Sequence, residues 1–132
     1  MYDDTMKYEK PRVLIVDDSA TSLDLASAAL SDAGFEAHTL SSIFDLQSTM
    51  ETVRPHVLVM DLFMPALRGD LALNVLRKGG GHTCSVLLYS SAEEEILRVR
   101  ALAARADAYV RKSSDLTKLV RAVHQLAQKG KP

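Results

Sequence analysis

Short runs of apolar residues alternate along the chain with longer segments in which apolar residues recur every three or four positions. A short apolar run without alternation is typical of a strand buried on both faces, whereas the longer period is typical of one face of a helix. The short runs predict strands at residues 13–16, 35–40, 57–60, 86–89 and 108–110.

Five helices are predicted between and after these strands. The first begins at Ser19, a residue type suited to a helix N-cap, and it ends at Gly34. The third is predicted over residues 70–78. The second, fourth and fifth helices are marked by the apolar sets Ile43, Leu46, Met50 and Val53, then Ile96, Val99, Leu102 and Ala103, and last Leu116, Leu119, Val120, Val123, Leu126 and Ala127.

Strands that alternate with helices predict an α/β domain, in which a parallel sheet is covered by helices on both faces. The pattern contains no internal repeat and no linker. We therefore expect one three-layer domain over residues 12–128, with a flexible lead-in at 1–11 and a short tail at 129–132.

Composition narrows the class of protein. The 132 residues suffice for one domain with an ordinary core, and the formal net charge of -1 provides no basic field for nucleic acid or an anionic membrane. Cys84 is the single cysteine, which excludes an internal disulfide and a cysteine-rich zinc site. No apolar run approaches the length of a membrane span, and the amino-terminal residues are too charged for a signal peptide. We expect a cytoplasmic protein without a nucleic-acid or membrane partner.

Polar residues follow four of the five predicted strands near the point where each ends. Asp17 and Asp18 follow the first strand, Asp61 the third, Ser90 the fourth and Lys112 the fifth. Ligands of open α/β sheets bind at the carboxyl ends of the strands, so these side chains are expected to converge on one edge.

Three carboxylates at one edge repel one another unless positive charge lies among them. Lys112 supplies one positive charge. A hard divalent cation such as Mg2+ would supply the rest of the positive charge, because the ligands are oxygen atoms without His or Cys. Mg2+ commonly shares its ligands with a phosphate group, so phosphoryl transfer to one carboxylate is the leading chemical hypothesis.

The pattern resembles the receiver domain of bacterial two-component response regulators, the CheY-like superfamily. Each shared feature is weak alone, but together, in this order and at strand ends, they are specific. The family fold is a flavodoxin-like, doubly wound sheet of five parallel strands in the order 2-1-3-4-5, the order known for flavodoxin and CheY, and it agrees with the predicted elements. The shared residues are the pair Asp17-Asp18, Asp61 followed by Pro65 and Gly69, Ser90, and Tyr109 three positions before Lys112.

The resemblance implies a phosphoacceptor and a metal site. Asp61 would accept the phosphoryl group. Asp17 and Asp18 would bind Mg2+, Asp18 directly, together with an Asp61 oxygen and the backbone carbonyl of Phe63. Mn2+ could substitute for Mg2+.

The resemblance also implies a phosphoryl-binding group and a switch. Lys112 would pair with the acyl phosphate, and Ser90 would donate a hydrogen bond to it, while Ser91 is small enough to admit the phosphodonor. Movement of Ser90 toward the phosphoryl group would let Tyr109 turn inward.

The partners implied by the resemblance are a sensor histidine kinase or a phosphotransfer protein, which would supply the phosphoryl group. The chain would be a self-phosphorylating and autodephosphorylating switch rather than an enzyme with a separate substrate. The fourth helix, fifth strand and fifth helix would form the surface that meets an output protein or a second copy of the chain. That surface carries Arg98, Arg105, Tyr109, Arg111, Lys118 and Arg121.

Other interpretations remain open. A receiver-like docking or dimerisation module that is never phosphorylated would have the same fold, although such modules usually lose one of the acidic residues or the lysine. A phosphatase of the haloacid-dehalogenase type needs Asp-x-Asp after the first strand, whereas this strand is followed by Asp17-Asp18-Ser19, and nucleotide binding needs a Gly-rich turn there. Taken alone, the acidic pair would also suit the positive end of the first helix, and Tyr109 would also suit packing.

Ser91 stands where the family commonly has alanine, and two further departures from the family pattern bear on the site. Ser113 follows Lys112 where the family usually has proline, often after a cis peptide bond. A cis bond before another residue type costs about 3 kcal/mol, so we expect a trans bond and a differently shaped loop. Phe63 is bulky where the family often has a polar residue, and its ring would slow the attack of water on the acyl phosphate.

Overall fold

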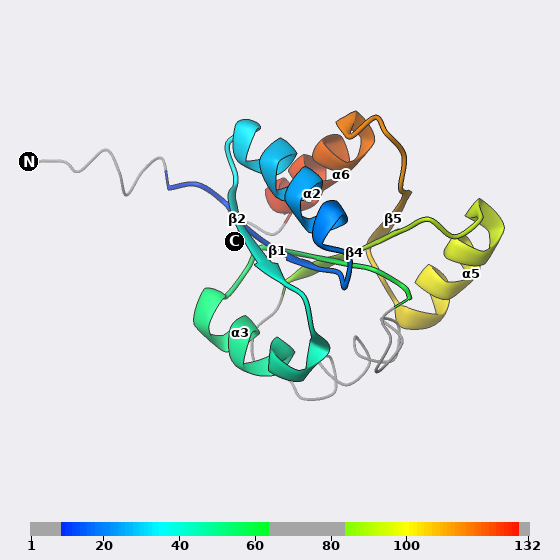
Figure 1. The fold of residues 1–132 in the computed structure, drawn as a ribbon, viewed down its shortest axis with the longest axis horizontal. Coiled ribbons are helices and arrows are strands. Elements are labelled where there is room, and N and C mark those ends of the chain that lie inside the picture. Colours follow the sequence, from blue (N-terminus) through cyan, green and yellow to red (C-terminus); the bar gives the residue numbers. More distant parts are fainter. Residues whose placement is uncertain (1–8, 64–83, 130–132) are drawn as a thin grey trace, which may run out of the picture.

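The computed structural model describes residues 9–63 and 84–129, in which a parallel sheet lies between helices (Figure 1). Among these residues, no helix combines the length and the apolar character that crossing a bilayer requires. The elements are β1 (Arg12–Val16), α2 (Ala20–Asp32), β2 (Glu36–Leu40), the 3-10 helix η1 (Ile43–Asp45), α3 (Leu46–Val53), β3 (Val57–Met60), β4 (Ser85–Ser90), α5 (Glu94–Ala104), β5 (Ala108–Arg111) and α6 (Thr117–Lys129).

The five strands are all parallel and follow the order β2-β1-β3-β4-β5, which confirms the predicted topology. The first strand is central: Val16 pairs with Leu40 of β2 on one side and with Met60 of β3 on the other. All the predicted strands are present. The predicted third helix at 70–78, with Pro65 and Gly69, lies outside the described residues.

Two apolar cores form because successive side chains of a strand point to opposite faces of the sheet. Val13 and Ile15 face α2 and α6, whereas Leu14 and Val16 face α3 and α5. Figure 1 shows the two pairs of helices on opposite sides of the sheet. Because both faces are covered, the inner strands β1 and β3 are nearly continuous apolar runs, as the sequence indicated.

The ends of the first helix are determined by its flanking residues. The Ser19 side chain accepts a hydrogen bond from the Ser22 backbone N–H, so Ser19 is the N-cap, as predicted. After the helix, Gly34 has φ = 99°, a conformation that residues with a Cβ rarely adopt. This turn lets Phe35 bury its ring at 3% exposure directly before β2.

The apolar face of α5 differs from the prediction. Leu97, Ala101 and Ala104 are buried, whereas Ile96, Val99 and Leu102 are 47%, 51% and 68% exposed. The helix carries two apolar rows of helical spacing, and the row with two alanines faces the sheet. Small side chains let a helix approach its neighbour closely. Residue volume therefore selects the buried row here, and periodicity alone did not distinguish the two rows.

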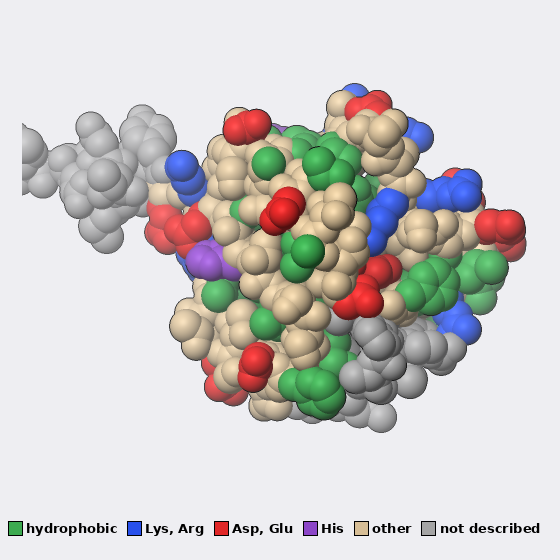
Figure 2. All heavy atoms as spheres, in the orientation of Figure 1, with side chains coloured by type: hydrophobic (Ala, Val, Ile, Leu, Met, Phe, Trp, Pro, Cys, Tyr) green, Lys and Arg blue, Asp and Glu red, His purple; other side chains and the backbone are tan. Residues whose placement is uncertain are grey.

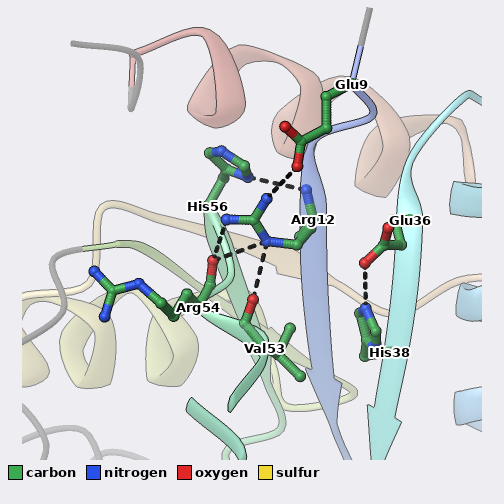
Figure 3. Close-up of polar contacts among 7 residues, drawn as sticks. All are labelled: Glu9, Arg12, Glu36, His38, Val53, Arg54 and His56. Carbon is green, nitrogen blue, oxygen red and sulfur yellow. Dashed lines mark hydrogen bonds and ion pairs between the residues drawn. The ribbon is translucent and has the colours of Figure 1, made fainter. Parts of the chain in front are cut away.

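Arg12 connects β1 to the end of α3 at the amino-terminal edge of the sheet (Figure 3). Its Nε donates to the Val53 carbonyl at 2.9 Å, and its Nη2 donates to the Arg54 carbonyl at 2.9 Å. Its Nη1 lies 3.0 Å from the Glu9 carboxylate, and its backbone N–H donates to Nδ1 of His56 at 2.9 Å. The planar guanidinium thus satisfies carbonyl groups that the end of α3 leaves without helical partners.

We expect Arg12→Ala to lower the free energy of unfolding by about 1–3 kcal/mol, because two backbone carbonyls lose a charged donor. Urea unfolding at neutral pH measures this change. Arg12→Lys should recover only part of the loss, since an ammonium cannot reproduce the planar fork. Arg98→Ala is the matched control, because Arg98 pairs with Glu95 at 2.6 Å on an exposed helix face and should leave stability unchanged. Equal losses in the two alanine variants would contradict the assignment.

Candidate functional site

Three carboxylates meet at the carboxyl edge of the sheet. Asp17 and Asp18 follow β1 and Asp61 follows β3, and one oxygen from each lies within 4.8 Å of the others. In the part of the chain that the structure describes, no other group of acidic, His or Cys side chains is arranged in this way. Asp17 and Asp61 are 2% and 7% exposed, whereas Asp18 is exposed. Figure 2 shows acidic and basic side chains next to one another on this part of the surface.

Lys112 brings positive charge into the carboxylate cluster from the end of β5. Its Nζ lies 2.6 Å from Asp17 Oδ2 and 3.5 Å from Asp61 Oδ2, and its side chain is 19% exposed. Its backbone N–H donates to the Ser90 carbonyl at 2.8 Å, which ties the lysine to the end of β4. The strand ends thus place Lys112 beside both carboxylates.

The loop after Lys112 has the trans geometry that the sequence predicted, because no described peptide bond is cis. Ser113 Oγ donates to the Asp115 carbonyl at 3.0 Å and accepts from the Asp115 N–H. The serine therefore closes a short turn of its own, and Lys112 still reaches the carboxylates.

The charges in the cluster depend on one another. Burial raises the pKa of Asp61, and Asp17 adds to this effect, while Lys112 opposes it. Burial pulls the pKa of Lys112 down, but the hydrogen bond to Asp17 and the charge of Asp61 outweigh it, so the pKa of Lys112 is raised. Lys112 therefore remains an ammonium. Ionisation of the Asp61 carboxyl is less favourable in the folded protein than in water.

Ser90 and Ser91 stand in different surroundings at the end of β4. Ser90 is fully buried, and its Oγ accepts a hydrogen bond from the Ala92 N–H at 3.2 Å. Ser91 is exposed. Tyr109 is half-buried in β5, and its hydroxyl donates to Glu94 of α5 at 3.5 Å. The tyrosine therefore contacts the first turn of α5 rather than the carboxylates.

Phe63 lies directly beside the acidic cluster. Its backbone N–H donates to Asp61 Oδ1 at 3.3 Å, and its side chain is 54% exposed. Asp17 Oδ1, the oxygen that does not contact Lys112, accepts a hydrogen bond from the Ser19 N–H at 2.9 Å. The carboxylates of Asp17 and Asp61 are thus oriented by backbone donors on one side and by Lys112 on the other, with oxygen atoms that suit a hard cation.

Two residues that contact Lys112 were not among those singled out from the sequence. Ser22 Oγ accepts from Lys112 Nζ at 3.2 Å, and the Tyr89 ring centroid lies 5.6 Å from the same nitrogen. The available signal was positional: Ser22 lies one helical turn after the acidic pair, and Tyr89 directly precedes Ser90. Neither residue type is specific enough to be recognised on that basis.

Known proteins similar to this chain include two bacterial regulators. Regulatory protein AtoC of Escherichia coli is 34% identical over 108 residues, which cover 82% of this chain and 23% of that protein. Transcriptional regulatory protein PrrA of Mycobacterium leprae is 34% identical over 122 residues, which cover 90% of this chain and 51% of that protein. The chain therefore spans about half or less of these relatives.

The fold is shared with solved receiver domains. The receiver domain of the Francisella response regulator 1452 superposes with a TM-score of 0.83 at 23% identity, covering 92% of this chain and all of that domain. Residues 13–124 match the response regulator receiver domain family. The match covers the acidic cluster and Lys112 as well as the sheet, and the chain accordingly belongs to the family of response regulator receiver domains.

Proposed function

We propose that the chain is a phosphoacceptor receiver in a two-component phosphorelay and that Asp61 takes the phosphoryl group. The observation that carries the proposal is the position of Asp61, which is buried at the end of β3 with Lys112 Nζ 3.5 Å away and two further carboxylates within 4.8 Å. The donor would be a phosphohistidine of a sensor kinase or a phosphotransfer protein. We assign the receiver to residues 12–128, with a lead-in at 1–11 and a tail at 129–132.

The acidic cluster fits Mg2+, or Mn2+ in its place. Asp17, Asp18 and Asp61 would supply carboxylate oxygens, and Phe63 would supply its backbone carbonyl. Two of the carboxylates are buried, and one ammonium does not neutralise three negative charges. The ion would shield the negative charge of the incoming phosphoryl group and of the carboxylates.

The side chains of the site would act in an in-line transfer. An oxygen of Asp61 forms the bond to phosphorus as the donor nitrogen or oxygen leaves with its electron pair. Lys112 remains protonated and pairs with the phosphoryl oxygens, and Ser90 donates its hydroxyl hydrogen to one of them. The exposed Ser91 leaves room for the donor. The exposed Phe63 ring limits the access of water and prolongs the life of the acyl phosphate.

The signal would leave the site through Ser90 and Tyr109. Ser90 moves toward the phosphoryl group, which lets Tyr109 leave Glu94 and turn inward. Tyr109 adjoins the surface formed by α5, β5 and α6, on which Ile96, Val99 and Leu102 form an exposed apolar row. We assign this surface to contact with an output protein or a second copy of the chain.

Incubation with acetyl phosphate and Mg2+ should add one phosphoryl group to the intact protein, as measured by mass spectrometry. Asp61→Asn should abolish the addition because the nucleophilic oxygen is lost, and omission of Mg2+ should reduce it strongly. Asp24→Asn, at an exposed acid of α2, is the control and should behave as wild type. A folded protein that binds Mg2+ but gains no mass would instead be an unphosphorylated docking module.

Mg2+ should raise the thermal unfolding temperature, because an ion bound only by the folded state stabilises it by about 1.4 kcal/mol at a tenfold excess over its dissociation constant. Differential scanning calorimetry measures the shift. Asp18→Asn should remove most of it, while Asp24→Asn should preserve it. The same shift in both variants would place the ion elsewhere.

Asp61→Asn should stabilise the metal-free protein at neutral pH. The pKa of Asp61 is raised in the folded state, so its ionised form is less favourable there than in the unfolded chain. The penalty is complete above the raised folded-state pKa, and it vanishes below the ordinary value for aspartate. Urea unfolding at several pH values should therefore show a stabilising effect that shrinks as the solution becomes acidic. A stabilisation by Asp61→Asn that grows as the pH falls would contradict the raised pKa of Asp61.

A further inference from the structure

Four groups from four different segments surround the ammonium of Lys112. Asp17 Oδ2 lies at 2.6 Å, Ser22 Oγ at 3.2 Å and Asp61 Oδ2 at 3.5 Å, and the centroid of the Tyr89 ring lies at 5.6 Å. An ammonium group has three hydrogens to donate. Asp17 and Ser22 accept two of them, so one remains for Asp61 or for a phosphoryl group attached to it.

Ser22 is itself held in a defined position. Its backbone N–H donates to the Ser19 side chain at 3.2 Å in the first turn of α2. The Ser19 N–H in turn donates to Asp17 Oδ1 at 2.9 Å. The serine that contacts Lys112 therefore belongs to the same hydrogen-bonded turn that orients Asp17, and this turn fixes the backbone from which the hydroxyl reaches the ammonium.

Tyr89 limits the space available to the lysine. Its side chain is 6% exposed and packs in the core between the sheet and the pair α2 and α6. The ammonium lies over this ring at a distance typical of a cation–π contact. Lys112 is thus restrained by an aromatic surface and by a hydroxyl in addition to its carboxylate partner.

We propose that Ser22 is a positioning residue for Lys112: its hydroxyl, with the Tyr89 ring, keeps the ammonium within reach of Asp61 before the phosphoryl group arrives. This inference rests on the proposed phosphorylation of Asp61. The long side chain of lysine loses rotational freedom when it is fixed in one position. Ser22 brings about this loss before the reaction, so less of it has to occur during phosphoryl transfer.

The step that Ser22 assists is phosphoryl transfer to Asp61, and this transfer requires no change in the protonation of Lys112. With acetyl phosphate as donor, an Asp61 oxygen forms a bond to phosphorus and the bond from phosphorus to the acetyl oxygen breaks. Acetate leaves with the electron pair. Lys112 keeps all its protons and contacts the phosphoryl oxygens as their charge develops. The Ser22 hydroxyl accepts its hydrogen bond from Lys112, so its contribution to the rate depends on Lys112.

The first test compares rates of phosphoryl incorporation from acetyl phosphate at saturating Mg2+, followed by intact-mass spectrometry. Ser22→Ala should slow incorporation about three- to tenfold, the size expected from the net contribution of one ordinary intramolecular hydrogen bond. Ser22→Thr should restore the rate to within about twofold, because the hydroxyl is kept. Thr21→Ala, at an exposed neighbouring position on α2, is the matched control and should react as wild type.

A double-mutant cycle separates positioning from a general effect on the fold. Ser22→Ala should lower the urea midpoint in the wild-type background, and it should have little effect in Lys112→Met, where the hydrogen bond is already absent. The same drop in both backgrounds overturns the proposal, because Ser22 would then act on α2 alone. An unchanged rate for Ser22→Ala, in a protein that is phosphorylated on Asp61, also overturns it.

The two proposals can fail separately. If the wild-type protein takes up no phosphoryl group, the proposed function fails, and the positioning of Lys112 for that reaction fails with it. The urea cycle would still decide whether Ser22 and Lys112 interact. If the wild type reacts but Ser22→Ala reacts equally fast, the function stands and only the role of Ser22 is lost.

Discussion

The ion pair between Lys112 and Asp17, 2.6 Å long and largely buried, is the interaction on which the candidate site depends. Two buried carboxylates at neighbouring strand ends would otherwise repel each other without compensation. Removing one partner of a buried pair leaves an uncompensated charge, which is costly. The lysine connects the carboxyl ends of several strands: its backbone N–H donates a hydrogen bond to the Ser90 carbonyl, while its ammonium reaches Asp17 and Asp61.

The sheet explains why these groups can meet although they are far apart in the sequence. Parallel pairing aligns the carboxyl ends of β1, β3, β4 and β5, so the residues that follow each strand share one edge. Because helices cover both faces of the sheet, charged groups can reach solvent at the ends of the strands. At the opposite edge, Arg12 connects β1 with the end of α3 (Figure 3). The Arg12 contacts that stabilise the fold thus lie at the amino-terminal end of the strands, and the candidate site lies at their carboxyl ends.

Most of the features that the sequence predicted well have a short-range cause. The apolar runs predicted all five strands, and Ser19 was recognised as an N-cap. The grouping of Asp17, Asp18 and Asp61 has a long-range cause, and it was predicted from the rule that parallel strands bring their carboxyl ends together. The buried row of α5 was not predicted, because two rows of apolar residues had helical spacing and the row with the smaller side chains is the one that packs on the sheet. The contacts of Ser22 and Tyr89 with Lys112 were also missed, since they depend on where a long side chain of a distant residue comes to lie.

The choice of small residues on the buried row of α5 has a thermodynamic consequence. Ala101 and Ala104 each bury little apolar area, and Leu97 is the one large side chain among the fully buried residues that attach this helix to the sheet. A weakly attached helix separates from its neighbours at a lower free energy than the rest of the fold. Any protein that covers Ile96, Val99 and Leu102 would also hold α5 in place. Recognition at this surface and the local order of the helix are therefore linked, and each strengthens the other.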